Sequence, residues 1–443
     1  MTHEPWQRRG LSRRDFLRRA GAAGIAVPSL AAILAACGGG AQETPGGGGG
    51  GGTETGGDNP YGTGGIGGAP YPLARIDAPV TWNITDDNPP IASDLEPESG
   101  GTLKIFNWNY YLSKSLMRQF GEQHGVTVEL TTFDDMADGI QKITSGEVDF
   151  DLMFGVQVYT LGRLIAGGFL QPLNHDYIPN LAANVWEPFQ SPFYDLESRY
   201  SMPYAVWNTG IMWRNDHVTA DIAAMENPWD VFWTDAPAEK THLLNNSRDL
   251  LSLAMYRQGQ TDVNTGDPAV IRAAKDLIAE VVAATNAKLD HNDYADVPKG
   301  RAYLHQSWSG NVGSAFYFLP EGDTAPNISY YWPGSSDGIP GSVENDTVTI
   351  LKTAQNPVLA HLFIDFILDT ENARTNYTTY TGYQQPMKEI TPESLVGSAV
   401  VPEHLVSTVV TEEDFTRGYR ILELAPDVEA LWESAYQEIL AGV

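Results

Sequence analysis

The residue types that most often carry out catalysis are scattered along this chain. Its nine histidines follow no H-E-x-x-H pattern and there is a single cysteine, so a zinc site has no signature. No Walker loop or dinucleotide-binding glycine pattern occurs outside one glycine-rich stretch. Adjacent acids such as Asp134-Asp135 and Glu412-Glu413 lie on polar stretches typical of solvated faces. We therefore expect no catalytic residue, metal or cofactor, and an exported hydrolase with a carboxylate pair is the less favoured alternative.

The first forty residues have the layout of a bacterial export signal. Arg13-Arg14 precede an apolar run of small residues over 20–36, which ends at Cys37. That run is about 17 residues long and contains Gly and Pro, so it is too short and broken for a stable spanning helix. The sequence Leu-Ala-Ala-Cys resembles the lipobox of bacterial lipoproteins, in which the thiol is lipidated. We expect a twin-arginine signal peptide over 1–36 and a lipid anchor on Cys37 at the outer face of the cytoplasmic membrane.

The chain is strongly acidic, with a net charge of −29. Removal of residues 1–36 takes away six Arg and two acids, which leaves 21 basic and 54 acidic residues and a net charge of −33. Nucleic acid needs a basic footprint, so it is excluded as a partner. Anionic headgroups would also repel this surface, so attachment to the membrane must come from the lipid. With Cys37 as the only cysteine, the exported domain has no internal disulfide.

Composition divides the rest of the chain into a glycine-rich tether over 37–69, a Pro- and Asp-rich extended arm over 70–100, and a folded region from residue 101. Strands that alternate with helices imply an α/β fold with a parallel sheet, and a second set of such elements implies a second lobe. Hydrophobic periodicity predicts strands over 102–106, 126–130, 149–153 and 211–213, and helices over 113–124, 135–145, 160–166, 250–258 and 268–284.

Several motifs occur in the order known from one protein family. They are F-N-W-N-Y-Y at 106–111, F-D-L at 150–152 with G-F-L-Q-P-L at 168–173, the crossing segment M-P-Y-A-V-W-N-T-G at 202–210, W-S-G-N at 308–311, Y-W-P at 331–333, N-D-T at 345–347 and G-Y at 382–383. From about residue 101 onward the chain resembles the periplasmic spermidine/putrescine-binding proteins of ABC importers, within the type II solute-binding proteins. The resemblance implies two lobes with a ligand cleft between them.

The resemblance also implies which residues form the cleft. A polyamine needs aromatic faces over its methylenes and a carboxylate at each ammonium group. Candidates for the aromatic wall are Trp108, Tyr111, Trp308 and Tyr383, and candidates for the carboxylates are Asp249 and Asp346. Asn109 belongs to the same first motif. Asp249 could equally cap the helix that follows it or pair with Arg248, and Asp346 could instead cap a strand.

Several positions depart from the family pattern. An acid is usual where this chain has Tyr110, and Asp is usual where it has Asn246 and Asn311. Glu344 stands where relatives carry an aromatic residue and could restore a negative charge. The segment 155–158 lacks the hydroxyl of the family's serine-bearing loop. A smaller carboxylate set keeps other ligands open: an amino acid, another small amine, or ferric ion held by tyrosines such as Tyr110-Tyr111 or Tyr377, Tyr380 and Tyr383.

The family also predicts organisation and partners. One lobe is expected over 101–208 plus 344–391 and the other over 209–343 plus 392–443, with hinge motion near 208–210 and 342–345. A monomer is expected that binds a small polyamine-like molecule and passes it to an ABC permease in the membrane. Five tryptophans are expected to serve packing alone: Trp186, Trp229, Trp233, Trp332 and Trp432.

Overall fold

The computed structural model describes residues 61–65, 70–133, 136–146, 149–315, 318–319, 327–398 and 400–442. The expected signal peptide, Cys37, most of the glycine-rich tether and the pair Asp134-Asp135 lie outside these residues. Among the helices of the described ranges, none has the length and apolar character that crossing a membrane requires.

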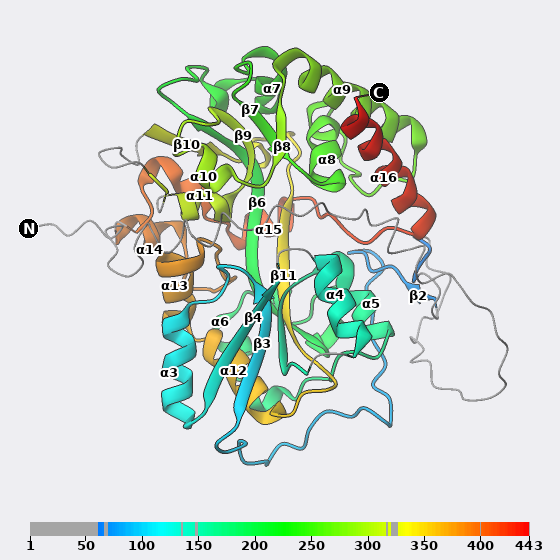
Figure 1. The fold of residues 1–443 in the computed structure, drawn as a ribbon, viewed down its shortest axis with the longest axis vertical. Coiled ribbons are helices and arrows are strands. Elements are labelled where there is room, and N and C mark those ends of the chain that lie inside the picture. Colours follow the sequence, from blue (N-terminus) through cyan, green and yellow to red (C-terminus); the bar gives the residue numbers. More distant parts are fainter. Residues whose placement is uncertain are drawn as a thin grey trace, which may run out of the picture.

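A twisted sheet of nine strands is the backbone of the molecule (Figure 1). Its strand order is β4-β3-β5-β11-β6-β9-β7-β8, and β10 also pairs with β6. The strands are β3 (Thr102–Trp108), β4 (Thr127–Phe133), β5 (Leu152–Gln157), β6 (Ser201–Arg214), β7 (Thr241–Leu244), β8 (Lys288–Asp290), β9 (Leu304–Trp308), β10 (Ile328–Tyr331) and β11 (Val343–Ile350). A separate antiparallel pair joins β1 (Thr63–Gly64) to β2 (Tyr71–Pro72).

Strand β6 joins the two lobes, and Figure 1 shows it running from one to the other beside β11. Its residues 201–208 pair with β11, whereas residues 209–213 pair with β9 and 211–214 with β10. The strand is buried at nearly every position, so both of its faces are covered and its sequence does not alternate between apolar and polar residues. The predicted strand at 211–213 is one end of this crossing strand.

Helices pack around each half of the sheet, which confirms the predicted α/β class with two lobes (Figure 1). The first lobe contains β3, β4, β5 and β11 with α3 (Lys114–His124), α4 (Met136–Ser145), α5 (Val158–Ala166), α6 (Asn180–Asn184), α12 (Pro357–Ile367) and α13 (Thr370–Asn376). The second lobe contains β7 to β10 with α7 (Val231–Thr234), α8 (Ser247–Arg257), α9 (Pro268–Thr285), α10 (Asp293–Asp296), α11 (Ser309–Ala315) and α16 (Pro426–Ala441). Helices α14 (Pro392–Gly397) and α15 (Glu412–Arg417) lie between them.

Local signals in the sequence explain where these elements begin and end. Helix α3 ends at Gly125, whose φ of 67° is favourable for glycine. Helix α8 begins after Asn246, whose side chain accepts a hydrogen bond from the Asp249 amide. The strand predicted over 149–153 is wrong by a few residues, because β5 starts at Leu152. The Asp151 side chain instead accepts hydrogen bonds from the amides of Lys104, Gln355 and Asn356.

Three hydrophobic clusters hold the lobes together. One lies under α8, α9 and α16 in the second lobe, and another flanks β3 and β5 in the first. The largest includes residues of both lobes, such as Phe154 and Tyr330, so the lobes share part of their core. The tryptophans expected to serve packing lie in these clusters: Trp186, Trp229, Trp332 and Trp432 are buried, and Trp233 is partly buried.

The residues that precede the folded region pack against it. Tyr71 and Trp82 are buried in the cluster beside β3 and β5. The Tyr71 hydroxyl donates a hydrogen bond to Glu423 at 2.6 Å. Arg163 of α5 pairs with Glu423 at 2.9 Å and with Glu429 of α16 at 2.8 Å. These contacts form a clasp of Arg163, Glu423 and Glu429 that joins the first lobe to the second.

Candidate functional site

The candidate residues follow the carboxyl ends of strands in both lobes, which is where ligands bind in open α/β sheets. In the first lobe, Trp108 ends β3 and Tyr159 follows β5. In the second lobe, Asp249 follows β7 and Trp308 ends β9. The hydrogen bond from the Tyr383 hydroxyl to Asn311 Oδ1, at 2.9 Å, joins the two groups.

Asp346 is a buried carboxylate of the first lobe with one oxygen hydrogen-bonded and the other unpartnered. It lies on β11, and its side chain is buried. The Tyr111 hydroxyl donates a hydrogen bond to Oδ2 at 2.9 Å, whereas Oδ1 has no hydrogen-bond partner. Burial raises the pKa of Asp346 to about 7, and the Tyr111 hydrogen bond opposes that rise. A buried, unpartnered carboxylate oxygen is costly in itself, so this position is suited to receive a hydrogen-bond donor of positive charge.

A series of packed aromatic rings leads away from this carboxylate, starting at Tyr111. The Tyr111 ring meets Tyr383 edge to face at 5.2 Å, and Tyr383 meets Trp207 in the same way at 5.8 Å. Trp108 is held in place because its Nε1 donates to the Gly155 carbonyl at 2.9 Å. Gly155 has φ +69°, and a Cβ there would lie 2.2 Å from the Trp108 ring. Gly155, in the segment that lacks the expected hydroxyl, thus leaves room for the Trp108 indole.

A chain of hydrogen bonds fixes the amide at Asn311. Asn311 Oδ1 accepts from Tyr383, and its Nδ2 donates to Asp293 Oδ1 at 2.7 Å. Ser307 donates to the other oxygen of Asp293. Burial raises the pKa of Asp293. At position 311, where the family resemblance implies an Asp, this chain has an Asn. The structure places a buried acid, Asp293, in hydrogen-bond contact with that amide.

Asp249 lies in the first turn of α8, and the residue that caps this helix is Asn246 rather than Asp249. Asn246 caps α8: its Oδ1 accepts from the Asp249 amide and its Nδ2 donates to Asp249 Oδ2, both at 2.8 Å. The other carboxylate oxygen accepts long hydrogen bonds from Trp308 Nε1 and the Thr209 hydroxyl, each at 3.4 Å. Burial raises the pKa of Asp249. The His291 ring stacks on Trp308 at 5.4 Å and fixes the indole from its other side.

Glu344 lies two residues before Asp346 on β11 and lines a small cavity of about 10 Å³, room for about one water molecule. Burial, together with the charges of Asp249 and Asp346, raises the pKa of Glu344 well above its usual range. Its Oε1 has no hydrogen-bond partner. Arg420 lines the same cavity, and burial lowers its pKa to about 9.

Two residues expected in the site lie apart from the buried cluster. Asn109 and Tyr110 are exposed, in the turn after β3. Tyr110 is 48% exposed whereas Tyr111 is 7% exposed, so these adjacent tyrosines occupy different environments. They do not form the paired oxygen ligands that ferric ion would need.

Sequence reasoning missed three residues of this region. Asp293 stands in an ordinary polar stretch, and its role depends on the fold of the loop after β8. Tyr159 follows the segment that lacks the expected hydroxyl. Burial is the main cause that raises the pKa of Tyr159, and the nearby acids Glu344, Asp249 and Asp346 raise it further. Arg420 comes from the C-terminal tail. Proximity to the 155–158 motif could have identified Tyr159, but nothing local in the sequence marks the other two.

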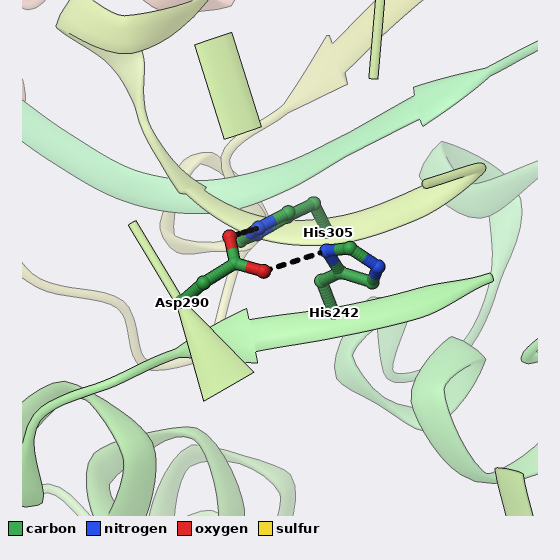
Figure 2. A group of neighbouring side chains, drawn as sticks. All are labelled: His242, Asp290 and His305. Carbon is green, nitrogen blue, oxygen red and sulfur yellow. Dashed lines mark hydrogen bonds and ion pairs between the residues drawn. The ribbon is translucent and has the colours of Figure 1, made fainter. Parts of the chain in front are cut away.

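The described part of the chain also contains one group of side chains with the spacing of metal ligands, His242, Asp290 and His305 in the second lobe (Figure 2). The segment that carries His291 and Asp293 links this group to Trp308 and Asn311 of the candidate site. The candidate site itself combines acids with aromatic rings, a set suited to bind an organic cation.

Comparison with known proteins agrees with this geometry. The family model described as bacterial extracellular solute-binding protein matches residues 115–399. The spermidine/putrescine-binding periplasmic protein 1 of Haemophilus influenzae is 23% identical over 346 residues, which cover 77% of this chain and 89% of the relative. The putrescine/agmatine-binding protein of Pseudomonas aeruginosa is 25% identical over 303 residues, which cover 66% of this chain and 80% of the relative.

Among solved structures, the spermidine/putrescine ABC transporter substrate-binding protein of Streptococcus pneumoniae superposes with a TM-score of 0.64. It is 21% identical, and the match covers 77% of this chain and 99% of that one. This likeness confirms the two-lobe fold. Together with the matches above, it confirms the family resemblance that the motifs predicted, and the proteins matched are solute-binding proteins rather than enzymes.

Proposed function

Because the chain belongs to the bacterial extracellular solute-binding proteins, we propose that it is the polyamine-binding component of an ABC importer. The observation that carries the proposal is the buried Asp346 carboxylate, which keeps one oxygen unpartnered while the other accepts from Tyr111, whose ring packs against Tyr383. An ammonium group would supply the missing donor and charge, and the rings would cover the adjoining methylenes. Curated relatives named for spermidine and putrescine, or for putrescine and agmatine, support this ligand class.

The second ammonium of a diamine would lie toward the second lobe. Asp249, held by Asn246, has one oxygen that accepts only the long bonds from Trp308 and Thr209, so a better donor could replace them. Glu344 adds a third carboxylate whose Oε1 is unpartnered. Ligand binding would favour the ionised form of each acid whose pKa burial now raises.

A zwitterionic ligand such as an amino acid is the second candidate, and one observation favours it. Glu344 Oε1 and Arg420 Nε are both buried without a hydrogen-bond partner, and both residues line the same cavity. Opposite charges on one wall could receive an ammonium and a carboxylate together once the lobes open, because the cavity now has room for about one water molecule. The diamine is preferred because Asp249 and Asp346 add two further acids to the region.

Binding is proposed to close the lobes over the ligand. The chain crosses between lobes near 208–210 in β6 and 342–345 at the start of β11, so these segments serve as hinges. The clasp of Arg163, Glu423 and Glu429 would stabilise the closed form. The closed protein, acting as a monomer, would then deliver its ligand to a membrane permease.

Export and anchoring complete the proposal. The twin arginines direct export, and lipidation of Cys37 attaches the protein to the outer face of the cytoplasmic membrane. Replacement of Cys37 by Ser should release the protein from the membrane fraction while ligand binding stays intact. A Cys37→Ser protein that remains on washed membranes would contradict the anchor.

Equilibrium dialysis with labelled putrescine, and separately with labelled glutamate and arginine, tests the proposed ligand class. The wild type should retain putrescine, and Asp346→Asn should bind it at least about tenfold more weakly, as expected when a charge-assisted contact is lost. Trp308→Ala should also weaken binding. Retention of an amino acid instead of putrescine would favour the zwitterion, and unchanged affinity in both variants would place the site elsewhere.

A further inference from the structure

Three neighbouring strands of the second lobe bring together two histidines that are far apart in the sequence. His242 of β7 stands opposite His305 of β9 on one side and Lys288 of β8 on the other. Residues in register on adjacent strands project from the same face of a sheet, and so does Asp290, two positions after Lys288. The strand pairing therefore places two imidazoles and a carboxylate at one point (Figure 2).

One ligand atom from each of the three side chains lies within 4.8 Å of the others, close enough for all three to reach one metal ion. His242 Nδ1 lies 2.9 Å from Asp290 Oδ2, and His305 Nε2 lies 3.3 Å from Asp290 Oδ1. Two atoms that each lie about 2.0–2.1 Å from a tetrahedral Zn²⁺ are about 3.3 Å apart. The three side chains are buried, so this is no exposed acidic patch.

The contact between His242 Nδ1 and Asp290 Oδ2 has the distance but not the orientation of a hydrogen bond, and His242 Nδ1 has no hydrogen-bond partner. The other close neighbour of Asp290 Oδ2 is the Lys288 ammonium at 3.0 Å. The Nδ1 atom of His305 contacts the Gln306 carbonyl, and its Nε2 faces the Asp290 carboxylate. A neutral imidazole has only one N–H, so both contacts of His305 require either a second proton or a metal ion on Nε2.

We propose that His242, Asp290 and His305 form a site for a divalent transition-metal ion of the zinc class. Two imidazole nitrogens and a carboxylate are ligands that zinc favours. The contact from His305 Nδ1 to a backbone carbonyl is the outer-shell arrangement typical of metal-bound histidines. Asp296 Oδ2 lies 3.9 Å from His242 Nδ1, within reach of a fourth ligand position after a small shift.

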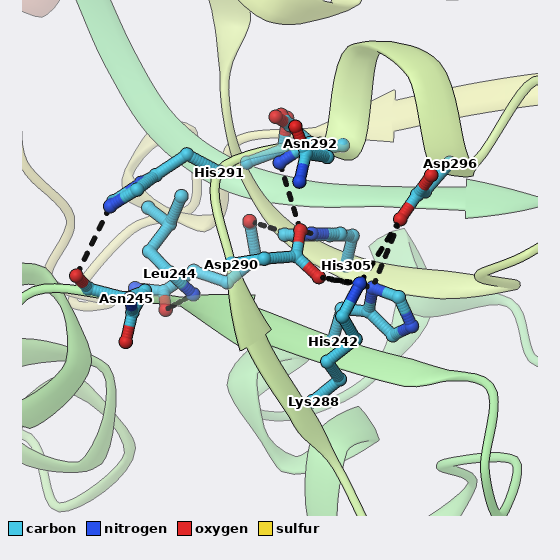
Figure 3. A network of polar contacts seen from close by, with 12 residues as sticks. His242, Leu244, Asn245, Lys288, Asp290, His291, Asn292, Asp296 and His305 are labelled. Atoms are coloured by element: carbon cyan, nitrogen blue, oxygen red, sulfur yellow. Dashed lines mark hydrogen bonds and ion pairs between the residues drawn. The ribbon is translucent and has the colours of Figure 1, made fainter. Parts of the chain in front are cut away.

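Lys288 provides a cation at the same place. Its ammonium lies 3.0 Å from Asp290 Oδ2 and 3.6 Å from Asp296 Oδ2, as Figure 3 shows. The side chain is 57% exposed, so it can swing into solvent without loss of core packing. Lysine and metal would therefore compete for the same carboxylates, and the lysine covers the route from the surface.

The metal would stabilise the loop that supports the ligand cleft. Asp290 also accepts a hydrogen bond from the Asn292 amide at 2.8 Å. Within the same loop, His291 stacks on Trp308 and Asp293 holds Asn311. The side chain of Gln306 donates to the Asp249 carbonyl at 2.8 Å. The proposed ion is thus structural, and its binding does not depend on which solute the cleft receives.

Calorimetric titration of the purified, chelator-treated protein with Zn²⁺, in the absence of any polyamine, tests this site. One zinc ion per chain is expected, and His242→Gln and His305→Gln should each weaken binding by at least about 100-fold, since even outer-shell changes cost about 10–100-fold. The matched control is His217→Gln, an exposed histidine of the same lobe, which should bind zinc as the wild type does.

Two further measurements guard against misfolded variants. Lys288→Ala should bind zinc more tightly than the wild type, because it removes the competing ammonium. Co²⁺ bound to the wild type should show the visible absorption of a tetrahedral site. Absence of saturable zinc binding, or equal binding by all the histidine variants, would overturn the proposal and leave His305 and Asp290 as a buried ion pair. Failure to bind polyamines would not affect this result.

Discussion

The affinity for a cationic ligand should depend on pH through Asp346. Burial raises the pKa of this carboxyl to about 7 in the ligand-free protein, so at pH 6 most molecules carry it protonated and at pH 8 most carry it ionised. A diamine remains doubly charged over this range, because amines of this type lose their protons near pH 10. Binding at pH 6 must therefore remove a proton from Asp346, whereas binding at pH 8 need not.

The size of this effect follows from the ionised fractions. With a pKa of about 7, the carboxylate is about 9% ionised at pH 6 and about 91% at pH 8, so the affinity should rise about tenfold, or about 1.4 kcal/mol. Calorimetric titration with putrescine in two buffers of different ionisation enthalpy measures both the affinity and the protons released. Proton release should be close to one per ligand at pH 6 and should fall toward zero at pH 8.

Two variants separate the sources of this dependence. Asp346→Asn should lose most of it, and Glu344→Gln reports the contribution of the neighbouring acid, whose pKa burial also raises. An affinity that is flat from pH 6 to pH 8, with no proton released by the wild type, would refute the assignment of Asp346 to the ammonium site.

Three further predictions concern stability and closure. The pKa of Asp346 is about 7 in the folded protein and lower in the unfolded chain, so the wild type loses stability as pH rises toward 7. Asp346→Asn removes this loss and should raise the free energy of unfolding at pH 8 by up to about 4 kcal/mol. Denaturation of the variant at pH 5 and pH 8 checks this: a gain no larger at pH 8 than at pH 5 would be inconsistent with a buried ionised acid. Gly155→Ala should destabilise the protein by about 1–3 kcal/mol and displace Trp108, because the new Cβ overlaps that ring. An unchanged melting temperature and an unchanged tryptophan fluorescence would argue against this packing. Arg163→Met should weaken ligand binding by about 3- to 30-fold, because the buried Glu423 would lose its ion pair across the lobes and keep only the Tyr71 hydroxyl as a donor. The exposed Arg118→Met should have no effect. Equal affinities in both variants would show that the clasp does not favour closure.

Much of the fold could be predicted from the sequence because its signals are local. The strand that became β3 and the helices α3, α4 and α9 were expected within a few residues of their observed bounds, since hydrophobic periodicity and flanking Gly, Asp and Pro mark them. The start of β5 was misplaced because Asp151 uses its carboxylate to bind the amides of Lys104, Gln355 and Asn356. That role depends on a segment about 200 residues later, so no local pattern could indicate it.

The candidate site shows the same division. Trp108, Tyr111 and Tyr383 were predicted from ordered motifs, and in the structure Tyr111 donates a hydrogen bond to Asp346 and its ring meets that of Tyr383. Asp293 could not, because it acts through Asn311 and its position depends on the loop after β8. His242 and His305 are similarly uninformative in the sequence, because only strand pairing makes them neighbours. Dispersed histidines therefore did not exclude a group of metal-ligand spacing in the folded chain.

The central claim is that the cleft binds a polyamine through its buried acids. Calorimetric titration of the purified protein with putrescine, spermidine and spermine, at low and high salt, tests this most directly. Micromolar or tighter binding of at least one of them is expected, weakened only modestly by salt because the carboxylates are buried. A protein that unfolds cooperatively yet gives no heat with any of the three would contradict the claim, and would show that Asn246 and Asn311 mark a different ligand.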